Sequence, residues 1–79
     1  MSIVTVPRLG EMTEEVVLIE WLVAVGDRVA VGTPLVLVET DKVESEIPST
    51  ANGLVVELMA EEDDELAVGD PVCRIEEGN

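Results

Sequence analysis

A single lysine is the chemically most distinctive residue of this chain of 79 residues. Lys42 lies within the sequence Glu-Thr-Asp-Lys-Val-Glu at positions 39–44. An apolar run at 35–38 precedes this stretch, and a second extended run at 44–47 follows it and ends at Pro48. Two strand-forming runs on either side of polar residues predict a β-hairpin with Lys42 at the reversal of direction. A primary amine exposed at a turn is a group that another enzyme can convert to an amide.

Lys42 is not expected to act as a base or a nucleophile by itself. A free lysine amine has a reference pKa of about 10.4, so it is protonated at neutral pH. The acidic neighbours in the sequence favour the charged form further; they are Glu39, Asp41, Glu44 and Glu46. Taken alone, the residue types favour an ordinary exposed lysine, because most lysines lie on protein surfaces.

The charge of the chain restricts the partners that it can bind. The chain has 18 acidic residues against 4 basic ones, which gives a formal charge of −14. Nucleic acids and anionic membranes attract basic surfaces, so neither a nucleic-acid partner nor a membrane partner is expected. An acidic surface instead favours attraction to basic partner surfaces.

Histidine is absent, and Cys73 is the one cysteine. Without histidine, the usual hydrolase sites and imidazole metal sites are excluded, and we predict no catalytic residue and no metal site. The acidic run at 61–65 lacks the alternating spacing and the glycine of a calcium loop, so we interpret it as a solvated turn. Cys73 is expected to be a buried, inert thiol, which a reducing compartment suits.

The sequence contains an internal repeat. A shift of 37 positions places residues 27–35 over residues 64–72, and both share the pattern Asp-x-x-Ala-Val-Gly-x-Pro. Each half is typical of short strands separated by turn residues, such as Asn52-Gly53, without a helical period. The expected strands cover residues 3–6, 16–23, 29–32 and 35–40 in the first half, and 44–47, 54–59, 66–69 and 72–75 in the second.

Two similar sets of four strands predict an all-β fold, a flattened barrel or sandwich of two four-stranded antiparallel sheets with quasi-twofold symmetry. Pro7 falls over Pro48 at a shift of 41, so the first half is expected to carry a loop about four residues longer, within Arg8 to Glu15. The symmetry places the Lys42 turn and the chain termini at opposite poles. One domain is expected over residues 1–76, with an interdomain linker beginning at 77–79, and neither a secretory signal nor a membrane-spanning run is found.

With this lysine turn at the centre of its repeat, the chain resembles the lipoyl domains of 2-oxo-acid dehydrogenase complexes, within the family of biotinyl and lipoyl carriers. The resemblance extends over essentially the whole chain. It is carried by Asp41-Lys42-Val43, Trp21, Gly26-Asp27, Pro34-Leu35 and Asn52-Gly53. It implies that Lys42 is amide-linked to (R)-lipoate.

The resemblance also implies a carrier function within an acyltransferase component, not catalysis by the domain itself. The lipoyl group would accept an acyl group from a 2-oxo-acid decarboxylase and deliver it to the acyltransferase catalytic core for transfer to coenzyme A. Dihydrolipoamide dehydrogenase would then reoxidise it. The isolated domain is expected to be a monomer, in the bacterial cytoplasm or, in a eukaryote, in the mitochondrial matrix.

Further residues are interpreted as contacts for these partners. Asp41 and Val43 would shape the turn that a lipoyl ligase reads, and Glu39 and Glu46 would contribute to docking. The loop that follows the first strand would help the decarboxylase to recognise the domain; it consists of Arg8, Leu9, Gly10, Glu11, Met12, Thr13 and Glu14. The alternatives are solvated acidic side chains and a tolerated surface insertion.

Two other functions are compatible with the sequence. The closer one is a biotin carboxyl carrier domain of the same fold, although that family has Met on both sides of its lysine, where Asp41 and Val43 stand here. The other is an unmodified acidic module used only for protein interaction. The chain also departs from the lipoyl family at Val16 and Asp63, where glycine is common, although an Asp can adopt the left-handed conformation.

Overall fold

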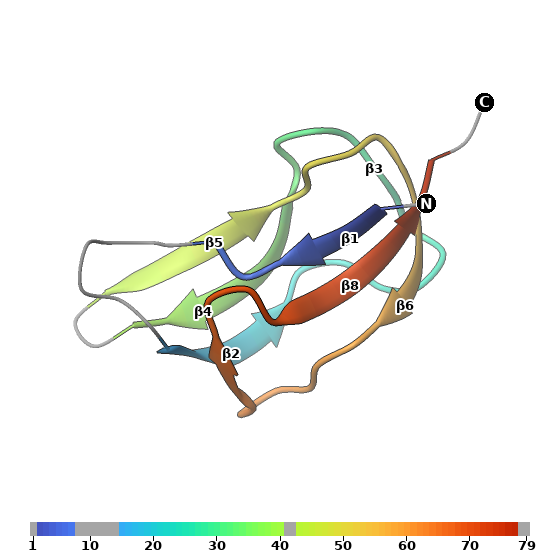
Figure 1. Cartoon of the computed structure of the whole chain (residues 1–79). Coiled ribbons are helices and arrows are strands. Elements are labelled where there is room, and N and C mark those ends of the chain that lie inside the picture. Colours follow the sequence, from blue (N-terminus) through green and yellow to red (C-terminus); the bar gives the residue numbers. More distant parts are fainter. Residues whose placement is uncertain (1, 8–14, 41–42, 78–79) are drawn as a thin grey trace.

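The chain folds into eight β-strands in two layers (Figure 1), and the computed structural model describes residues 2–7, 15–40 and 43–77. The strands are β1 (Ser2–Thr5), β2 (Glu15–Trp21), β3 (Arg28–Val29), β4 (Pro34–Glu39), β5 (Glu44–Pro48), β6 (Gly53–Leu58), β7 (Glu65–Ala67) and β8 (Pro71–Glu76). In the described residues there is no helix that could span a membrane. The all-β prediction is confirmed, with strand ends shifted by up to three residues; the largest shift is at β3, which ends at Val29 and not at residue 32.

Each sheet contains strands from both halves of the sequence. One sheet has the order β1-β8-β6-β3 and the other the order β5-β4-β2-β7, and all pairs are antiparallel. Each strand of the first half has a counterpart four strands later, so that β1 corresponds to β5 and β4 to β8. Replacing every strand by its counterpart converts one strand order into the other. The predicted quasi-twofold symmetry is therefore confirmed, and the two sheets pack their apolar faces together as one core.

The irregularities of the two sheets repeat as well. The β2–β4 register shifts between Leu18 and Glu20, and the β6–β8 register shifts between Val55 and Glu57, which lie 37 positions later. After these strands, the N–H groups of Gly26 and Asp63 donate to the carbonyls of Val55 and Leu18, respectively. Gly26 has φ 100° and Asp63 has φ 73°, so the aspartate does adopt the left-handed conformation that glycine takes in the first half.

The expected alignment of Pro7 with Pro48 is wrong. Thr5 pairs with Pro71, and Pro48 pairs with Pro34, which lies 37 positions before Pro71. Thr5 is therefore equivalent to Pro48, at a shift of 43 positions (5 to 48). The strands that follow keep the shift of 37. The connection from β1 to β2 is therefore six residues longer than the connection from β5 to β6 (43 against 37), not four.

A core of aliphatic side chains lies between the sheets. Its fully buried members include Leu18, Leu35, Ile47 and Ile75. Trp21 packs against this core and donates from Nε1 to the Ala60 carbonyl at 3.0 Å, so its role is structural. Burial of Cys73 is confirmed as well, and it raises the pKa of the thiol to about 11. Cys73 therefore stays protonated and unreactive at neutral pH.

The β4–β5 hairpin and the chain termini lie at opposite ends of the molecule (Figure 1). At the end with the termini, Ser2 Oγ donates to the Glu77 carboxylate, and this bond lowers the pKa of Glu77. At the hairpin end, the polypeptide passes from Thr40 to Val43. The fold thus places Thr40 and Val43 at the pole opposite the termini.

Candidate functional site

The β4–β5 hairpin is the scaffold of the candidate site. Val36 pairs with Ile47, and these two side chains are buried, while Leu37 pairs with Glu46 on the opposite face. The alternation follows from the pleat, which turns successive side chains to opposite faces. Apolar residues on one face therefore fix the register that brings the two ends of the hairpin together.

Thr40 and Val43 close the hairpin. The Thr40 N–H donates to the Val43 carbonyl at 2.8 Å, and the Thr40 hydroxyl donates to the same oxygen at 3.0 Å. Two residues connect this closing pair, Asp41 and Lys42, and both lie outside the described residues. The predicted reversal of the chain is confirmed by the pairing on either side of them.

The described residues of the predicted recognition set lie at this pole. Glu39 and Glu46 are exposed, and Val43 is 59% exposed. The predicted recognition loop, residues 8–14, lies outside the described residues. The last residue described before it is Pro7, and the first after it is Glu15.

Glutamates form a row across the outer face of the β5-β4-β2-β7 sheet. Glu44 pairs with Glu39, Glu39 pairs with Val17, and Val17 pairs with Glu65. Residues directly opposite each other share a face, so Glu39 and Glu65 flank Val17, and Glu44 lies beyond Glu39. In the described part of the chain, no group of three or more potential ligands could hold a metal ion.

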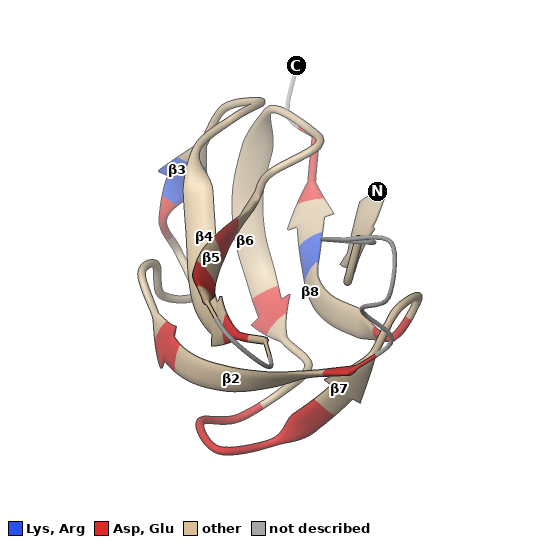
Figure 2. Ribbon diagram, turned by 90° about the vertical axis from the view of Figure 1, so that its left-hand side faces the viewer, with Lys and Arg blue, Asp and Glu red and all other residues tan. Residues whose placement is uncertain are grey.

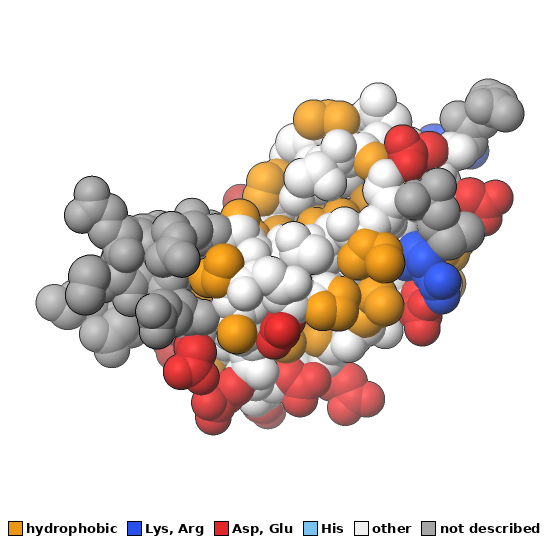
Figure 3. All heavy atoms as spheres, viewed as in Figure 1, with side chains coloured by type: hydrophobic (Ala, Val, Ile, Leu, Met, Phe, Trp, Pro, Cys, Tyr) orange, Lys and Arg blue, Asp and Glu red, His pale blue; other side chains and the backbone are white. Residues whose placement is uncertain are grey.

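The two sheets differ strongly in charge (Figure 2). The strands of the β5-β4-β2-β7 sheet carry six glutamates and no lysine or arginine, whereas those of the other sheet carry two glutamates and two arginines. Figure 3 shows acidic side chains gathered along one edge and basic ones at the end near the termini. A basic partner would therefore be attracted to the hairpin sheet more than to its counterpart.

An open pocket of about 320 Å³ lies beside the hairpin. It is lined by Glu15, Val16, Val17, Glu39, Thr40 and Glu65. Glu15 follows directly after the predicted recognition loop, and Thr40 directly precedes the lysine turn. The pocket therefore brings together Glu15 and Thr40, the described residues that border these two segments.

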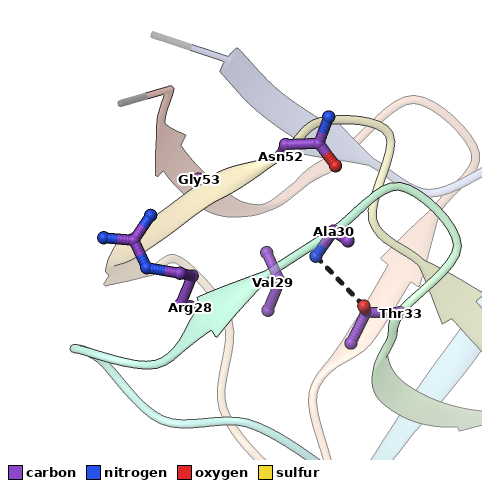
Figure 4. Close-up of a pocket in the computed structure, with 6 residues that line it drawn as sticks. All are labelled: Arg28, Val29, Ala30, Thr33, Asn52 and Gly53. Carbon is purple, nitrogen blue, oxygen red and sulfur yellow. Dashed lines mark hydrogen bonds between the residues drawn. The ribbon is translucent and has the colours of Figure 1, made fainter. Parts of the chain in front are cut away.

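A second pocket, of about 420 Å³, occupies the repeat-related position at the other end of the molecule (Figure 4). It is lined by Arg28, Val29, Ala30, Thr33, Asn52 and Gly53. At a shift of 37 positions, Arg28 replaces Glu65 and Asn52 replaces Glu15. The two ends thus share a backbone plan but differ in charge, which allows a partner to distinguish them.

Comparison with known proteins identifies the family. The family model for biotin-requiring enzymes, which covers biotin and lipoyl attachment domains, matches residues 2–75. The chain belongs to the biotin–lipoyl family. An acetyltransferase component of the pyruvate dehydrogenase complex of Corynebacterium glutamicum is 49% identical over 76 residues. This match covers 96% of the chain and 11% of the relative.

Two further similarities agree with this family. A lipoamide acyltransferase component of the branched-chain alpha-keto acid dehydrogenase complex of Bacillus subtilis is 46% identical over 72 residues, which are 91% of the chain and 17% of the relative. The solution structure of the lipoyl domain of the 2-oxoglutarate dehydrogenase complex of Azotobacter vinelandii superposes with a TM-score of 0.77. That match has 25% identity and covers 100% of both chains. The biotin–lipoyl domain described here thus spans less than a fifth of the length of these two acyltransferases.

Two residues at the hairpin pole were not singled out by sequence reasoning. Thr40 was assigned no role, and Glu65 was not connected with the lysine turn. Only the strand register reveals Glu65, because it pairs with Val17, which in turn pairs with Glu39. A hydroxyl residue two positions before the lysine was the available signal for Thr40, since such side chains often bond to nearby backbone at turns.

Proposed function

We propose that this chain is a lipoyl carrier domain of the acyltransferase component of a 2-oxo-acid dehydrogenase complex, with Lys42 as the attachment residue. The observation that carries this proposal is the closed β4–β5 hairpin. Its closing residues leave only Asp41 and Lys42 between them, and Lys42 is the only lysine of the chain. The similarity to acyltransferase components named for lipoyl or lipoamide groups supports the choice of cofactor.

The residues around the turn fit a covalently attached group. Val43 is 59% exposed, and Glu39 and Glu44 are exposed, so the pole is accessible to a modifying enzyme. When attached, lipoate supplies a dithiolane disulfide that can be reduced and acylated. The residues that flank the turn, Thr40 and Val43, lie at the pole opposite the termini, and the carboxylates of this pole favour docking of basic surfaces on partner enzymes.

The partners follow from this role. They are a lipoyl ligase, a 2-oxo-acid decarboxylase, the acyltransferase catalytic core and dihydrolipoamide dehydrogenase. We further propose that residues 77–79 begin the linker to the remaining domains, that the domain itself is monomeric, and that it acts in the bacterial cytoplasm. The bacterial relatives support the last point.

Intact mass measurement tests the choice of cofactor. The 79-residue chain is incubated with ATP and either a lipoyl ligase and lipoate or a biotin ligase and biotin. We expect a gain of one lipoyl group with the first pair and no gain with the second, because Asp41 and Val43 replace the methionines that flank a biotinylated lysine. A gain of biotin alone would indicate a biotin carrier, and no gain with either ligase would indicate an unmodified interaction module.

We propose that residues 8–14 contribute to recognition by the decarboxylase. Support comes from Glu15, which follows this loop and shares a pocket with Thr40. Replacing the loop by that of a lipoyl domain from a different complex should lower kcat/KM for acylation by the cognate decarboxylase about tenfold, as the loss of about 1.4 kcal/mol of binding would. Lipoylation by the ligase serves as the control and should not change. Unchanged acylation would show that the loop is a tolerated insertion.

A further inference from the structure

Thr40 forms both hydrogen bonds that the structure records across the end of the β4–β5 hairpin. Its N–H and its Oγ1 donate to the same Val43 carbonyl, at 2.8 and 3.0 Å. In a regular hydrogen-bonded pair of an antiparallel ladder, the two residues exchange N–H···O bonds in both directions. Here the threonine hydroxyl adds a second bond to the carbonyl that its own backbone N–H already reaches.

Other features of this end do not favour closure. The last pair of the ladder is Glu39 with Glu44, and like charges directly opposite each other destabilise a sheet. The favoured two-residue hairpin connections contain glycine, whereas this connection is Asp41-Lys42. Closure therefore depends strongly on the two bonds that Thr40 donates.

The environment of Thr40 holds its hydroxyl in place. The residue is half-buried, in contrast to the exposed Glu39 and Val43, and it lines the pocket with Val16 and Val17. A threonine side chain has few χ1 rotamers because its Cβ carries two heavy atoms. The hydroxyl therefore loses little freedom when it donates to the Val43 carbonyl.

We propose that the Thr40 hydroxyl positions the lysine turn for the lipoyl ligase. The hydroxyl fixes the backbone on both sides of residues 41–42, so that a large fraction of molecules offers the amine in the geometry that the ligase accepts. A protein whose competent conformation is only partly populated binds its partner more weakly in proportion to that fraction. The inference rests on the proposed function, in which Lys42 is lipoylated.

The ligase step itself leaves Thr40 unchanged. Lys42 Nζ attacks the carboxyl carbon of a lipoyl adenylate, which the ligase forms from lipoate and ATP. A C–N bond forms, the C–O bond to AMP breaks, and AMP leaves with the bonding electrons. The ammonium loses two protons to solvent, and nothing is oxidised or reduced. Thr40 is thus a positioning residue, not a catalytic one.

Steady-state lipoylation of two variants tests the proposal. Thr40→Val keeps the branched shape and removes the hydroxyl, whereas Thr40→Ser keeps the hydroxyl. We expect Thr40→Val to raise KM for the domain about tenfold with kcat within about twofold, as expected for a smaller competent fraction. Thr40→Ser should restore KM to within about twofold of the wild-type value on the same grounds.

Amide hydrogen exchange supplies a readout that does not depend on the ligase. In Thr40→Val the amide at position 40 should exchange about tenfold faster, because its bond opens more often. The amides of Leu18 and Val55, which donate to the carbonyls of Asp64 and Asp27, should keep their protection. If Thr40→Val loses this core protection, Thr40→Ala provides the same comparison.

The outcomes separate this inference from the proposed function. A wild-type chain that gains no lipoyl group refutes the proposed function itself. A wild-type chain that is lipoylated, with an unchanged KM in the folded variant that lacks the hydroxyl, overturns only the role of Thr40. An impaired Thr40→Ser would also overturn it, because the methyl group and not the hydroxyl would then be required.

Discussion

Lys42→Arg is expected to abolish the gain of a lipoyl group and to leave the fold intact. Arginine keeps the positive charge, but its guanidinium stays protonated in proteins and does not offer the free amine that the ligase acylates. Its neighbours Glu39 and Val43 are exposed, so the change in the free energy of unfolding should stay within about 0.5 kcal/mol. Intact mass after incubation with ligase, lipoate and ATP measures the first effect, and a thermal melt measures the second.

The matched control exchanges a lysine and an arginine within one chain. The double variant Lys42→Arg/Arg28→Lys keeps the composition and the charge of the chain. It moves the amine to position 28, which is exposed and lines the pocket at the other end of the molecule. It should gain no lipoyl group. Modification of the double variant would show that the ligase acylates any exposed lysine, and modification of Lys42→Arg would place the lipoyl group on the N-terminal amine. Either result would contradict the proposal that Lys42 is the attachment residue.

Lipoylation also changes the electrostatics of the hairpin pole. Conversion of the lysine ammonium to an amide removes its positive charge from a pole that already holds Glu39, Glu44 and Glu65. The modified domain is therefore more acidic at this pole than the unmodified one. A partner with a basic docking surface would be attracted to the modified form more strongly, in a manner that salt weakens.

The repeated sequence allows much of the fold to be predicted. The shift of 37 positions aligns turn residues whose conformations are specific, such as Gly32 and Gly69, with φ 93° and 95°. Because both halves carry the same turns, the same four strands must follow in each half. Burial of Cys73 follows in the same way, from its alignment with Val36 and from the apolar strand around both residues.

The incorrect alignment of the first strand with the fifth, which matched Pro7 with Pro48, has a physical cause. The prolines at 7 and 48 suggested a register, but Pro48 is the last residue of β5, at a register shift opposite Pro34, where neither residue can donate an N–H. Proline marks such places without fixing the register. Burial fixes it, since Val4 and Ile47 are both 1% exposed and pair with repeat-related partners, Cys73 and Val36.

The site could be predicted only in part, because it depends on contacts between distant strands. The lysine and the acids next to it are neighbours in the sequence, so their grouping needed no structure. Glu65 joins them only through the pairing of β2 with β4 and β7. Strand order is decided by the packing of both halves together, and a local pattern does not contain it.

Gly53→Ala is expected to lower the melting temperature by about 4–24 °C, and by more than Gly32→Ala does. A Cβ at Gly53 would lie 2.3 Å from the Glu76 carbonyl oxygen and 2.9 Å from Ile75 Cγ2. The nearest atoms belong to the backbone, and the neighbouring pair Leu54–Glu76 holds the two strands together, so β6 and β8 must separate. Overpacking of this kind costs about 1–3 kcal/mol, and each kcal/mol lowers the melting temperature of a small domain by about 4–8 °C.

Gly32→Ala is the matched control, because it adds the same methyl group where no atom lies within 4 Å. It should cost only the strain of φ 93°, about 1 kcal/mol, or about 4–8 °C. Since Gly53 lies at the pole opposite the hairpin, lipoylation of folded Gly53→Ala should keep its KM within about twofold, because distant sites act independently. A melting temperature for Gly53→Ala equal to or above that of Gly32→Ala would show that the strands separate at little cost. A raised KM would instead show that the spacing of β6 and β8 is transmitted to the hairpin pole.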